Sequence, residues 1–323
     1  MMFTIAIDSG GDYGFPVVLK GAKKEVQKNK DVEIVIVAGK DKLLHSYSIP
    51  ERVYLEQSDC TYSYDNKKNI RRTSIYRAIE MHKSGDVDAV IAPGDTTATV
   101  ISASKILKRI KRLHPYIPTH WPYNNTLIDV GAKQKCDTKD FLQLAILGKF
   151  YSENYIGARN PLIGILGMGE EAHKGDGLKL IEKLKDEGYR IAQRYFEGNS
   201  LADFEGNWVA LTEGKTGNSI LKLSEELFRK GWKDFRNRID KQTFLLRIFA
   251  YIGNYKPFRE MKEEFDWRNY AVSPLLCIKG NILIAHGRSD EKAISSAIRK
   301  TKEYLKKDLV SKLEEELDTN KKI

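Results

Sequence analysis

The chain has 323 residues, a formal net charge of +10 at pH 7 and 41% hydrophobic residues. This length and apolar content suffice for one large α/β unit or for two lobes that share a sheet. The cysteines, Cys60, Cys136 and Cys277, are too few and scattered for a disulfide framework or a zinc site, so we expect a cytoplasmic protein. No apolar run reaches the roughly 18–20 residues of a membrane span. The positive charge favours anionic partners, and no recognition motif indicates nucleic acid.

Short β-rich runs alternate with amphipathic helical patterns along the chain. The first expected strand is 3–8 (FTIAID), and a helical pattern begins at Val17. Such alternation predicts an α/β fold with a mostly parallel sheet and helices on both faces. The later expected strands are 32–39, about 52–57, 87–94, 127–131, 161–169, 207–214 and 273–287. The later expected helices are 73–85, 97–113, one from about Thr138, and 290–318.

Residues 224–268 interrupt this alternation. They are rich in aromatic and basic residues and predict two or three helices with a break near 253–257. We interpret them as a helical arm within a single α/β unit that spans 1–323. The apolar run 245–252, surrounded by Lys and Arg, predicts an arm for dimerisation and for contact with an anionic membrane surface. The alternative is an arm whose apolar face packs wholly inside a dimer bundle.

Small and acidic residues gather at the ends of the expected strands. In a parallel sheet these ends share one edge, so we expect the loops to converge on one cleft. Glycine amides and helix N-termini at such loops favour an anion. A Gly after a single strand is more often a plain turn, so the indication comes from the six loops together. The segments are SGGD (9–12), PGDTTAT (93–99), DVGAK (129–133), GMGEEAHKG (167–175), TEGKTGN (212–218) and AHGRSD (285–290).

The segment GMGEEAHKG carries the most chemistry. Glu170 and Glu171 are candidates to cap a helix or accept protons, and Lys174 is a candidate partner for a carboxylate or phosphate. His173 is a candidate acid or base, and a capped, solvated helix start is the alternative for the whole segment. His286, after the apolar run ILIA, is either a histidine at the edge of the core or a ligand contact. The sequence has no GxxxxGK[ST] or GxSxG motif, so P-loop chemistry is not indicated. Its histidines lack HExxH or comparable metal spacing.

Together these segments resemble the PlsX family of phosphate acyltransferases. The family's DAMGGD corresponds to IDSGGD, its SAGNTGA to APGDTTA, and its LLDVGAN-x-x-C to LIDVGAKQKC. Its GEE-x-x-KG motif is intact as GEEAHKG, and its EGxD and CDGFVGN segments correspond to EGNS and LTEGKTGN. Its APLLGVNG and GHG correspond to SPLLCIKG and AHG, so the resemblance covers essentially the whole chain.

The resemblance implies an enzyme that transfers a long acyl group from acyl carrier protein to inorganic phosphate. The product would be an acyl phosphate for phospholipid synthesis. The resemblance also implies a fold like that of the isocitrate and isopropylmalate dehydrogenases, a homodimer, peripheral contact with the inner face of the membrane, and no metal or cofactor. The basic surface suits the acidic carrier protein.

On this interpretation Lys174 is the candidate for stabilising phosphate or the oxyanion, and Asp129 and His173 are the other catalytic candidates. The alternative for Asp129 is a structural carboxylate that accepts hydrogen bonds from backbone N–H groups. The predicted substrate-binding residues are Gly10, Gly11, Asp12, Gly94, Asp95, Thr96, Gly131, Ala132, Gly169, Glu170, Glu171, Glu213, Gly214, Lys215, Asn218 and His286.

Departures from the family pattern lie in the expected site. Asp95 and Thr97 replace an Asn and a Gly, while Glu213 and Lys215 replace an Asp and a Phe. A carboxylate beside phosphate costs on the order of 1 kcal/mol or more at an effective dielectric near ~20, unless a cation such as Lys215 pairs with it. The departures fit ordinary drift within the family. They also fit a divergent acyltransferase that uses another donor or nucleophile in specialised metabolism, or a non-catalytic protein that binds the carrier.

Overall fold

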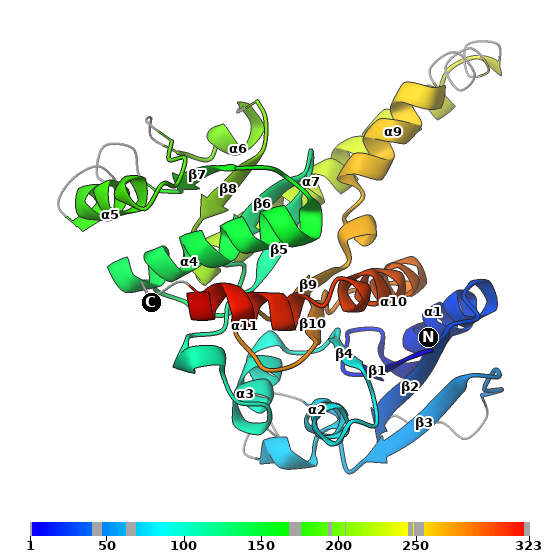
Figure 1. The fold of residues 1–323 in the computed structure, drawn as a ribbon. Helices are drawn as coiled ribbons and strands as arrows, with labels where there is room; N and C mark the ends of the chain where they lie inside the picture. The colour runs from blue at the N-terminus through cyan, green and yellow to red at the C-terminus, as the bar shows by residue number, and fades with distance from the viewer. Residues whose placement is uncertain are drawn as a thin grey trace.

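The computed structural model describes residues 2–40, 47–62, 69–167, 176–192, 196–203, 205–244, 248 and 255–319. It shows two β-sheets with helices packed on their faces and two helices that extend away from both sheets (Figure 1). Most strand pairs are parallel. The predicted α/β class, with mostly parallel strands and flanking helices, is therefore confirmed.

The first lobe is built on a six-stranded sheet of order β3-β2-β1-β4-β10-β9, in which β9 runs antiparallel to β10. Side chains alternate across a strand, so Ile5 and Ile7 of the first strand join one core cluster while Ala6 joins the cluster on the opposite face. The strands are β1 (Phe3–Asp8), β2 (Val32–Gly39), β3 (Val53–Ser58), β4 (Ala89–Ala92), β9 (Val272–Pro274) and β10 (Ile282–Ala285).

Two helices cover each face of this sheet. Helices α1 (Gly14–Lys28) and α10 (Glu291–Lys306) pack together on one face, and α2 (Ser74–Ser84) and α3 (Thr96–Ile106) pack together on the other. Gly21 permits the first contact, because a Cβ there would lie 2.6 Å from the Cβ of Ile294. The predicted C-terminal helix is in fact two helices, α10 and α11 (Leu309–Thr319).

The second lobe has a four-stranded sheet of order β5-β6-β8-β7, with β5 antiparallel to β6. Helices α4 (Thr138–Tyr151) and α5 (Asp176–Asp186) contribute to the core on one face, and α6 (Ser200–Asp203) lies on the other. The sequence did not predict β5, because the short segment PTHW carries no alternating apolar pattern. The strands are β5 (Pro118–Trp121), β6 (Asn125–Ile128), β7 (Leu162–Ile165) and β8 (Trp208–Leu211).

Helices α7 (Gly214–Asp240) and α9 (Tyr255–Phe265) extend together away from the sheets (Figure 1). The rings of Phe228 and Phe265 stack with centroids 5.0 Å apart and join the two helices. Helix α7 begins at Gly214, directly after β8, where the sequence predicts a helix after the strand 207–214. The same helix continues past residue 224 into the arm. The shorter helical turns are η2 (Ile110–Arg112), η3 (Ser152–Ile156) and η5 (Trp267–Tyr270).

Most of the apolar run 245–252 lies outside the described residues, so its predicted membrane contact remains a prediction. Within the described part of α7, Leu223 and Leu227 are 61% and 62% exposed. No helix among the described residues is long and apolar enough to cross a membrane.

Candidate active site

A cleft of about 1280 Å³ lies where loops of the two lobes meet, at the ends of β1, β4, β6, β8 and β10. Five of the six expected loops therefore converge, while 168–175 lies outside the described residues. The five loops come from two sheets and not from one edge of a single sheet. This arrangement places polar loops from both lobes around one space. The predicted substrate-binding residues that line the cleft are Gly10, Asp12, Gly94, Asp95, Thr96, Gly131, Gly214, Lys215, Asn218 and His286.

The loops of the first lobe touch one another through their backbones. The Asp12 N–H donates to the Gly287 carbonyl at 2.6 Å. A Cβ on Gly11 would lie only 2.9 Å from the same oxygen and 3.2 Å from the Pro93 carbonyl oxygen. Gly11 does not line the cleft. Its missing side chain instead lets the loops after β1, β4 and β10 meet, so its predicted substrate contact is replaced by a packing role.

Asp8 lies beneath these loops and was not predicted as a site residue. The Ser74 hydroxyl donates to its Oδ1 at 2.6 Å. A Cβ on Gly10 or on Gly94 would lie 2.6 Å or 2.9 Å from its Oδ2, so the carboxyl group supports both cleft-lining glycines from below. Burial raises the pKa of Asp8 to about 6. The segment IDSGGD contained this residue, but sequence alone gave no sign that its side chain turns under the loop.

Asp95 caps the N-terminus of α3. Its Oδ1 accepts a hydrogen bond from the Ala98 N–H at 2.7 Å, and the helix N-terminus stabilises its negative charge. Across the residues that the structure describes, no ion pair joins Lys215 to Asp95. The carboxylate therefore finds its compensation in the helix and not in the lysine that the sequence suggested.

Asp129 is fully buried directly after β6. Its Oδ1 accepts from the N–H groups of Ile117 at 3.1 Å, Gly131 at 3.2 Å and Ala132 at 3.1 Å. Its Oδ2 accepts from Ala132 at 3.0 Å and Lys133 at 2.7 Å. Burial raises the pKa of Asp129, while these N–H donors act in the opposite direction. The carboxylate holds the loop that carries Gly131, which favours the structural alternative over direct catalysis and gives Ala132 a backbone role.

The start of α7 packs tightly on that loop. The Gly214 N–H donates to the Lys133 carbonyl at 2.8 Å, and a Cβ on Gly217 would lie 2.0 Å from the Asp129 carbonyl oxygen. Glu213 turns toward the same loop, where its Oε1 accepts from the Cys136 N–H at 3.1 Å. Glu213 does not line the cleft, so the structure replaces its predicted substrate contact with a contact between two loops.

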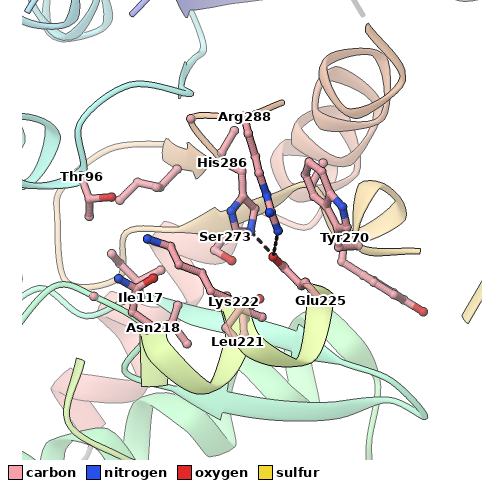
Figure 2. A pocket seen from close by; sticks show the side chains of 18 of the residues that line it. Thr96, Ile117, Asn218, Leu221, Lys222, Glu225, Tyr270, Ser273, His286 and Arg288 are labelled. Atoms are coloured by element: carbon pink, nitrogen blue, oxygen red, sulfur yellow. Dashed lines mark hydrogen bonds and ion pairs between the residues drawn. The ribbon is translucent and has the colours of Figure 1, made fainter. Parts of the chain in front are cut away.

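A charged cluster, not predicted from the sequence, closes one side of the cleft. Glu225 of α7 lies between His286 and Arg288, which follow β10 (Figure 2). Its Oε1 is 3.1 Å from His286 Nε2 and its Oε2 is 2.9 Å from Arg288 Nη2. The Arg288 guanidinium also pairs with Glu226 and lies 5.4 Å from the centroid of the Trp267 ring.

Other residues in the lining of the cleft are apolar or aromatic. Leu221 and Phe228 come from α7, and Trp121 comes from β5. His120 packs on Tyr270 with ring centroids 4.3 Å apart, and burial lowers the pKa of His120 to about 4. The imidazole is therefore neutral near pH 7 and belongs to this part of the lining. A cleft with a polar end and an apolar, aromatic end can hold an acyl chain and an anion together.

Several predicted site residues lie outside the described part of the chain. Among the residues that the structure does describe, no group of three or more His, Cys, Asp or Glu is placed to hold a metal ion. The lining of the cleft also includes Lys222 of α7, a cation that no sequence motif indicates (Figure 2). The predicted residues outside the described ranges are Gly169, Glu170, Glu171, His173 and Lys174.

Comparison with known proteins links this geometry to an enzyme family. The family model described as "Fatty acid synthesis protein" matches residues 3–312. The chain is 32% identical over 316 aligned residues to a phosphate acyltransferase of Campylobacter jejuni, covering 92% of this chain and 93% of that protein. It is 29% identical over 333 aligned residues to a phosphate acyltransferase of Nitratiruptor, covering 98% of each.

Two solved structures share the fold. A phosphotransacetylase from Streptococcus pyogenes has a TM-score of 0.59 at 12% identity, with 95% of each chain covered. A branched-chain phosphotransacylase from Enterococcus faecalis has a TM-score of 0.58 at 10% identity, with 94% of this chain and 99% of that chain covered. At these identities the likeness shows a common fold.

Proposed function

This chain belongs to the fatty acid synthesis protein family, and from that membership we propose that it transfers an acyl group from an acyl carrier protein thioester to inorganic phosphate. The relatives named as phosphate acyltransferases support an enzyme that transfers acyl groups to phosphate. The carrier protein as donor and an acyl phosphate as product are part of the proposal. The net charge of +10 suits both the acidic carrier and the anionic acceptor.

The observation that carries the proposal is the two-ended cleft. Its polar end is formed by glycine-rich loops that follow β1, β4 and β6 and by the start of α7. Backbone N–H groups at such loops favour a bound phosphate. Its apolar end offers aromatic and aliphatic side chains to an acyl chain. The thioester carbonyl would then lie between the two ends, within reach of the phosphate.

Catalysis requires groups that hold the phosphate and stabilise the oxyanion of the tetrahedral intermediate. Thr96 and Asn218 line the cleft and are our candidates for hydrogen bonds to phosphate. Lys174, which lies outside the described residues, remains the sequence-based candidate for phosphate or oxyanion stabilisation. Lys215 and Lys222 add positive charge to the lining of the cleft.

The direct test measures thioester consumption and identifies the products by mass spectrometry. We expect purified protein to consume an acyl thioester of carrier protein only when phosphate is present, and to release an acyl phosphate. Lys174→Ala should abolish this turnover without altering the circular dichroism spectrum. Thioester consumption at the same rate without phosphate would contradict the proposed acceptor, and wild-type rates in Lys174→Ala would remove that lysine from the mechanism.

A second candidate function is acyl transfer to another nucleophile. It is favoured by Asp95 and Lys215, which line the cleft where the family pattern has Asn and Phe. A panel of phosphate, amines and alcohols, offered with one acyl thioester, separates the candidates. A product formed faster with an amine or alcohol than with phosphate would support the second function.

The arm formed by α7 and α9 is proposed to support a homodimer and peripheral contact with anionic membrane. The proposal is supported by the exposed Leu223 and Leu227 and by cations along α7, including Lys233 and Arg236. Salt-sensitive sedimentation with anionic but not neutral vesicles, weakened by Lys233→Glu with Arg236→Glu, would support membrane contact. A dimer that never sediments with either vesicle would leave the arm with a role in oligomerisation only.

A further inference from the structure

We propose that Glu225 and His286 form a proton-transfer pair, in which His286 takes the proton of the attacking phosphate and delivers it to the departing thiolate. This inference rests on the proposed transfer from a thioester to phosphate. It assigns a catalytic role to His286 and a positioning role to Glu225, a residue that no sequence motif had indicated.

The Glu225 carboxylate faces Nε2 of the histidine. Glu225 Oε1 lies 3.1 Å from His286 Nε2. An ionised carboxylate only accepts hydrogen bonds, so in the proposed pair Nε2 carries the hydrogen that faces Glu225, and Nδ1 carries the lone pair. No hydrogen bond to Nδ1 is formed within the described part of the chain. A histidine oriented in this way is ready to accept a proton at Nδ1.

The histidine faces the part of the cleft where the phosphate is proposed to bind. His286 lines the cleft together with Thr96 and Asn218. In Figure 2, Thr96 and Asn218 lie on the other side of His286 from Glu225. The ring therefore contacts the buried carboxylate and shares the lining of the cleft with the two candidate phosphate contacts. The edge-to-face contact with Trp267, with ring centroids 5.0 Å apart, further restricts its orientation.

Arg288 gives Glu225 a second charged partner. The Glu225 side chain is only 8% exposed, and an unpaired carboxylate at such a position would be costly. Arg288 Nη2 lies 2.9 Å from Oε2, so the second oxygen also has a charged partner. Arg288 is itself held by Glu226 and by the face of Trp267. The carboxylate therefore has a fixed partner on each oxygen, and its orientation toward the histidine is defined.

The proposed step balances without any further reactant. An oxygen of HPO4²⁻ attacks the thioester carbonyl carbon and forms the new C–O bond, while its proton passes to His286 Nδ1. The resulting imidazolium is stabilised by Glu225. When the tetrahedral intermediate collapses, the C–S bond breaks and the imidazolium gives its proton to the sulfur. The products are an acyl phosphate dianion and a neutral thiol, and the histidine returns to its starting tautomer.

The decisive experiment compares two acyl donors in His286→Gln. An alkyl thioester, such as the carrier protein's own, releases a basic thiolate that needs a proton, whereas an aryl thioester of thionitrobenzoate releases a thiolate that does not. With the alkyl donor we expect the rate of the variant to fall by about 10²–10⁴-fold, the usual contribution of general acid–base catalysis. With the aryl donor we expect the factor by which the rate falls to be at least tenfold smaller. Equal losses with both donors, or no loss with either, would overturn the proposal.

A chemical rescue keeps the test informative if glutamine disturbs the loop. His286→Ala leaves space in the cleft for a small molecule. Added imidazole should therefore raise the rate of this variant with the alkyl donor at least tenfold. Circular dichroism and thermal unfolding confirm that both variants fold. Folded variants that imidazole does not rescue, together with equal losses on both donors, would show that His286 only binds or packs.

Glu225→Gln tests the positioning role. Arg288 would attract the amide oxygen, so the amide NH2 would face His286 Nε2 and force the proton onto Nδ1, the wrong tautomer. We expect a loss of kcat of about 10–10⁴-fold with little change in KM for phosphate. The matched control is Glu56→Gln, which breaks the Arg77–Glu56 pair of 2.8 Å in the first lobe and should leave kcat unchanged. A Glu225→Gln variant with wild-type kcat would overturn the pair.

The outcome for the wild-type protein separates this inference from the proposed function. If the wild-type protein shows no phosphate-dependent thioester consumption, the proposed function fails and the proton-transfer pair fails with it. Suppose instead that the wild-type protein forms acyl phosphate. If His286→Gln then loses the same factor in rate with both donors, or loses no rate with either, only the pair is overturned.

Discussion

Each lobe buries one aspartate at the end of a strand that leads into the cleft, but the two carboxyl groups are held very differently. Asp8 of the first lobe receives one side-chain hydrogen bond, from Ser74 at 2.6 Å. Asp129 of the second lobe receives its hydrogen bonds from backbone N–H groups of its own loop and of Ile117. Burial raises the pKa of both groups, to about 6 for Asp8.

The difference shows two ways of fixing a ligand-binding loop. Around Asp129 the loop wraps the carboxylate with N–H donors, so the side chain and the backbone conformation depend on each other. Around Asp8 the Ser74 hydroxyl and the Gly10 backbone N–H act on the carboxyl group, and Gly94 lies against it. We therefore expect the second-lobe aspartate to be essential for stability, and the first-lobe aspartate to lower stability at neutral pH.

The largest expected effect is that of Asp129→Asn. If the amide NH2 takes the place of Oδ1, it faces the backbone N–H donors of Ile117 and Gly131. If it takes the place of Oδ2, it faces the backbone N–H donor of Lys133. With two or more buried donors left unsatisfied, we expect the free energy of unfolding to fall by about 2–6 kcal/mol. Urea denaturation followed by circular dichroism measures this loss. Wild-type stability in this variant would mean that the N–H groups do not hold the loop.

Asp8→Asn should have the opposite sign at neutral pH. A carboxyl group whose folded pKa is raised stabilises the fold below its unfolded pKa of 3.8, and this stabilisation is lost as the pH rises through about 6. Asparagine carries no charge, so we expect the variant to gain up to about 3 kcal/mol over the wild type between pH 4 and pH 8. Urea denaturation at both pH values measures the difference.

The exposed Asp234 on α7 provides the control for this pH dependence. Asp234→Asn should track the wild type at both pH values, because an exposed carboxyl group gains little from being removed. If Asp8→Asn also follows the wild type from pH 4 to pH 8, the contrast between the two buried aspartates is wrong.

An intermediate effect is expected where α7 meets the Asp129 loop. A Cβ on Gly217 would lie 2.0 Å from the Asp129 carbonyl oxygen, so Gly217→Ala must displace backbone and should cost about 1–3 kcal/mol. Gly231 lies on the same helix with nothing within 4 Å of such a Cβ. Gly231→Ala should therefore gain up to about 1 kcal/mol from helix propensity. Thermal unfolding of both variants measures these effects. Equal shifts of the unfolding temperature in the two variants would contradict the close contact at Gly217.

The smallest effect on stability is expected for Asp95→Asn. Asparagine caps a helix as well as aspartate, so the free energy of unfolding should change by less than about 0.5 kcal/mol. Removing the negative charge from the lining of the cleft should preserve or raise phosphate-dependent transfer. A lower native activity would instead support a different acceptor. An unchanged rate with every acceptor would mean that the side chain does not contact the reacting group.

The alternation of strands and helices was readable along nearly the whole chain, because buried parallel strands need continuous apolar runs and their helices need amphipathic faces. The division into two sheets was not readable, because the order of strands depends on pairing between segments far apart in sequence. The antiparallel β5 was missed for the same reason, since its pairing with β6 is set by the fold and not by its own residues. The glycines and Asp129 stood out as motifs, but their actual contacts required the folded chain.

By itself, the sequence determined the α/β class, the family and the loops that surround the cleft, because these depend on local patterns and on motifs of adjacent residues. Only the tertiary structure decided that Asp8 supports two glycines, that Asp95 caps α3, and that Glu213 turns away from the cleft. It alone joined Glu225 to His286 and Arg288, which come from different elements. A pair of this kind leaves no local pattern, because its geometry exists only after α7 has packed beside the end of β10.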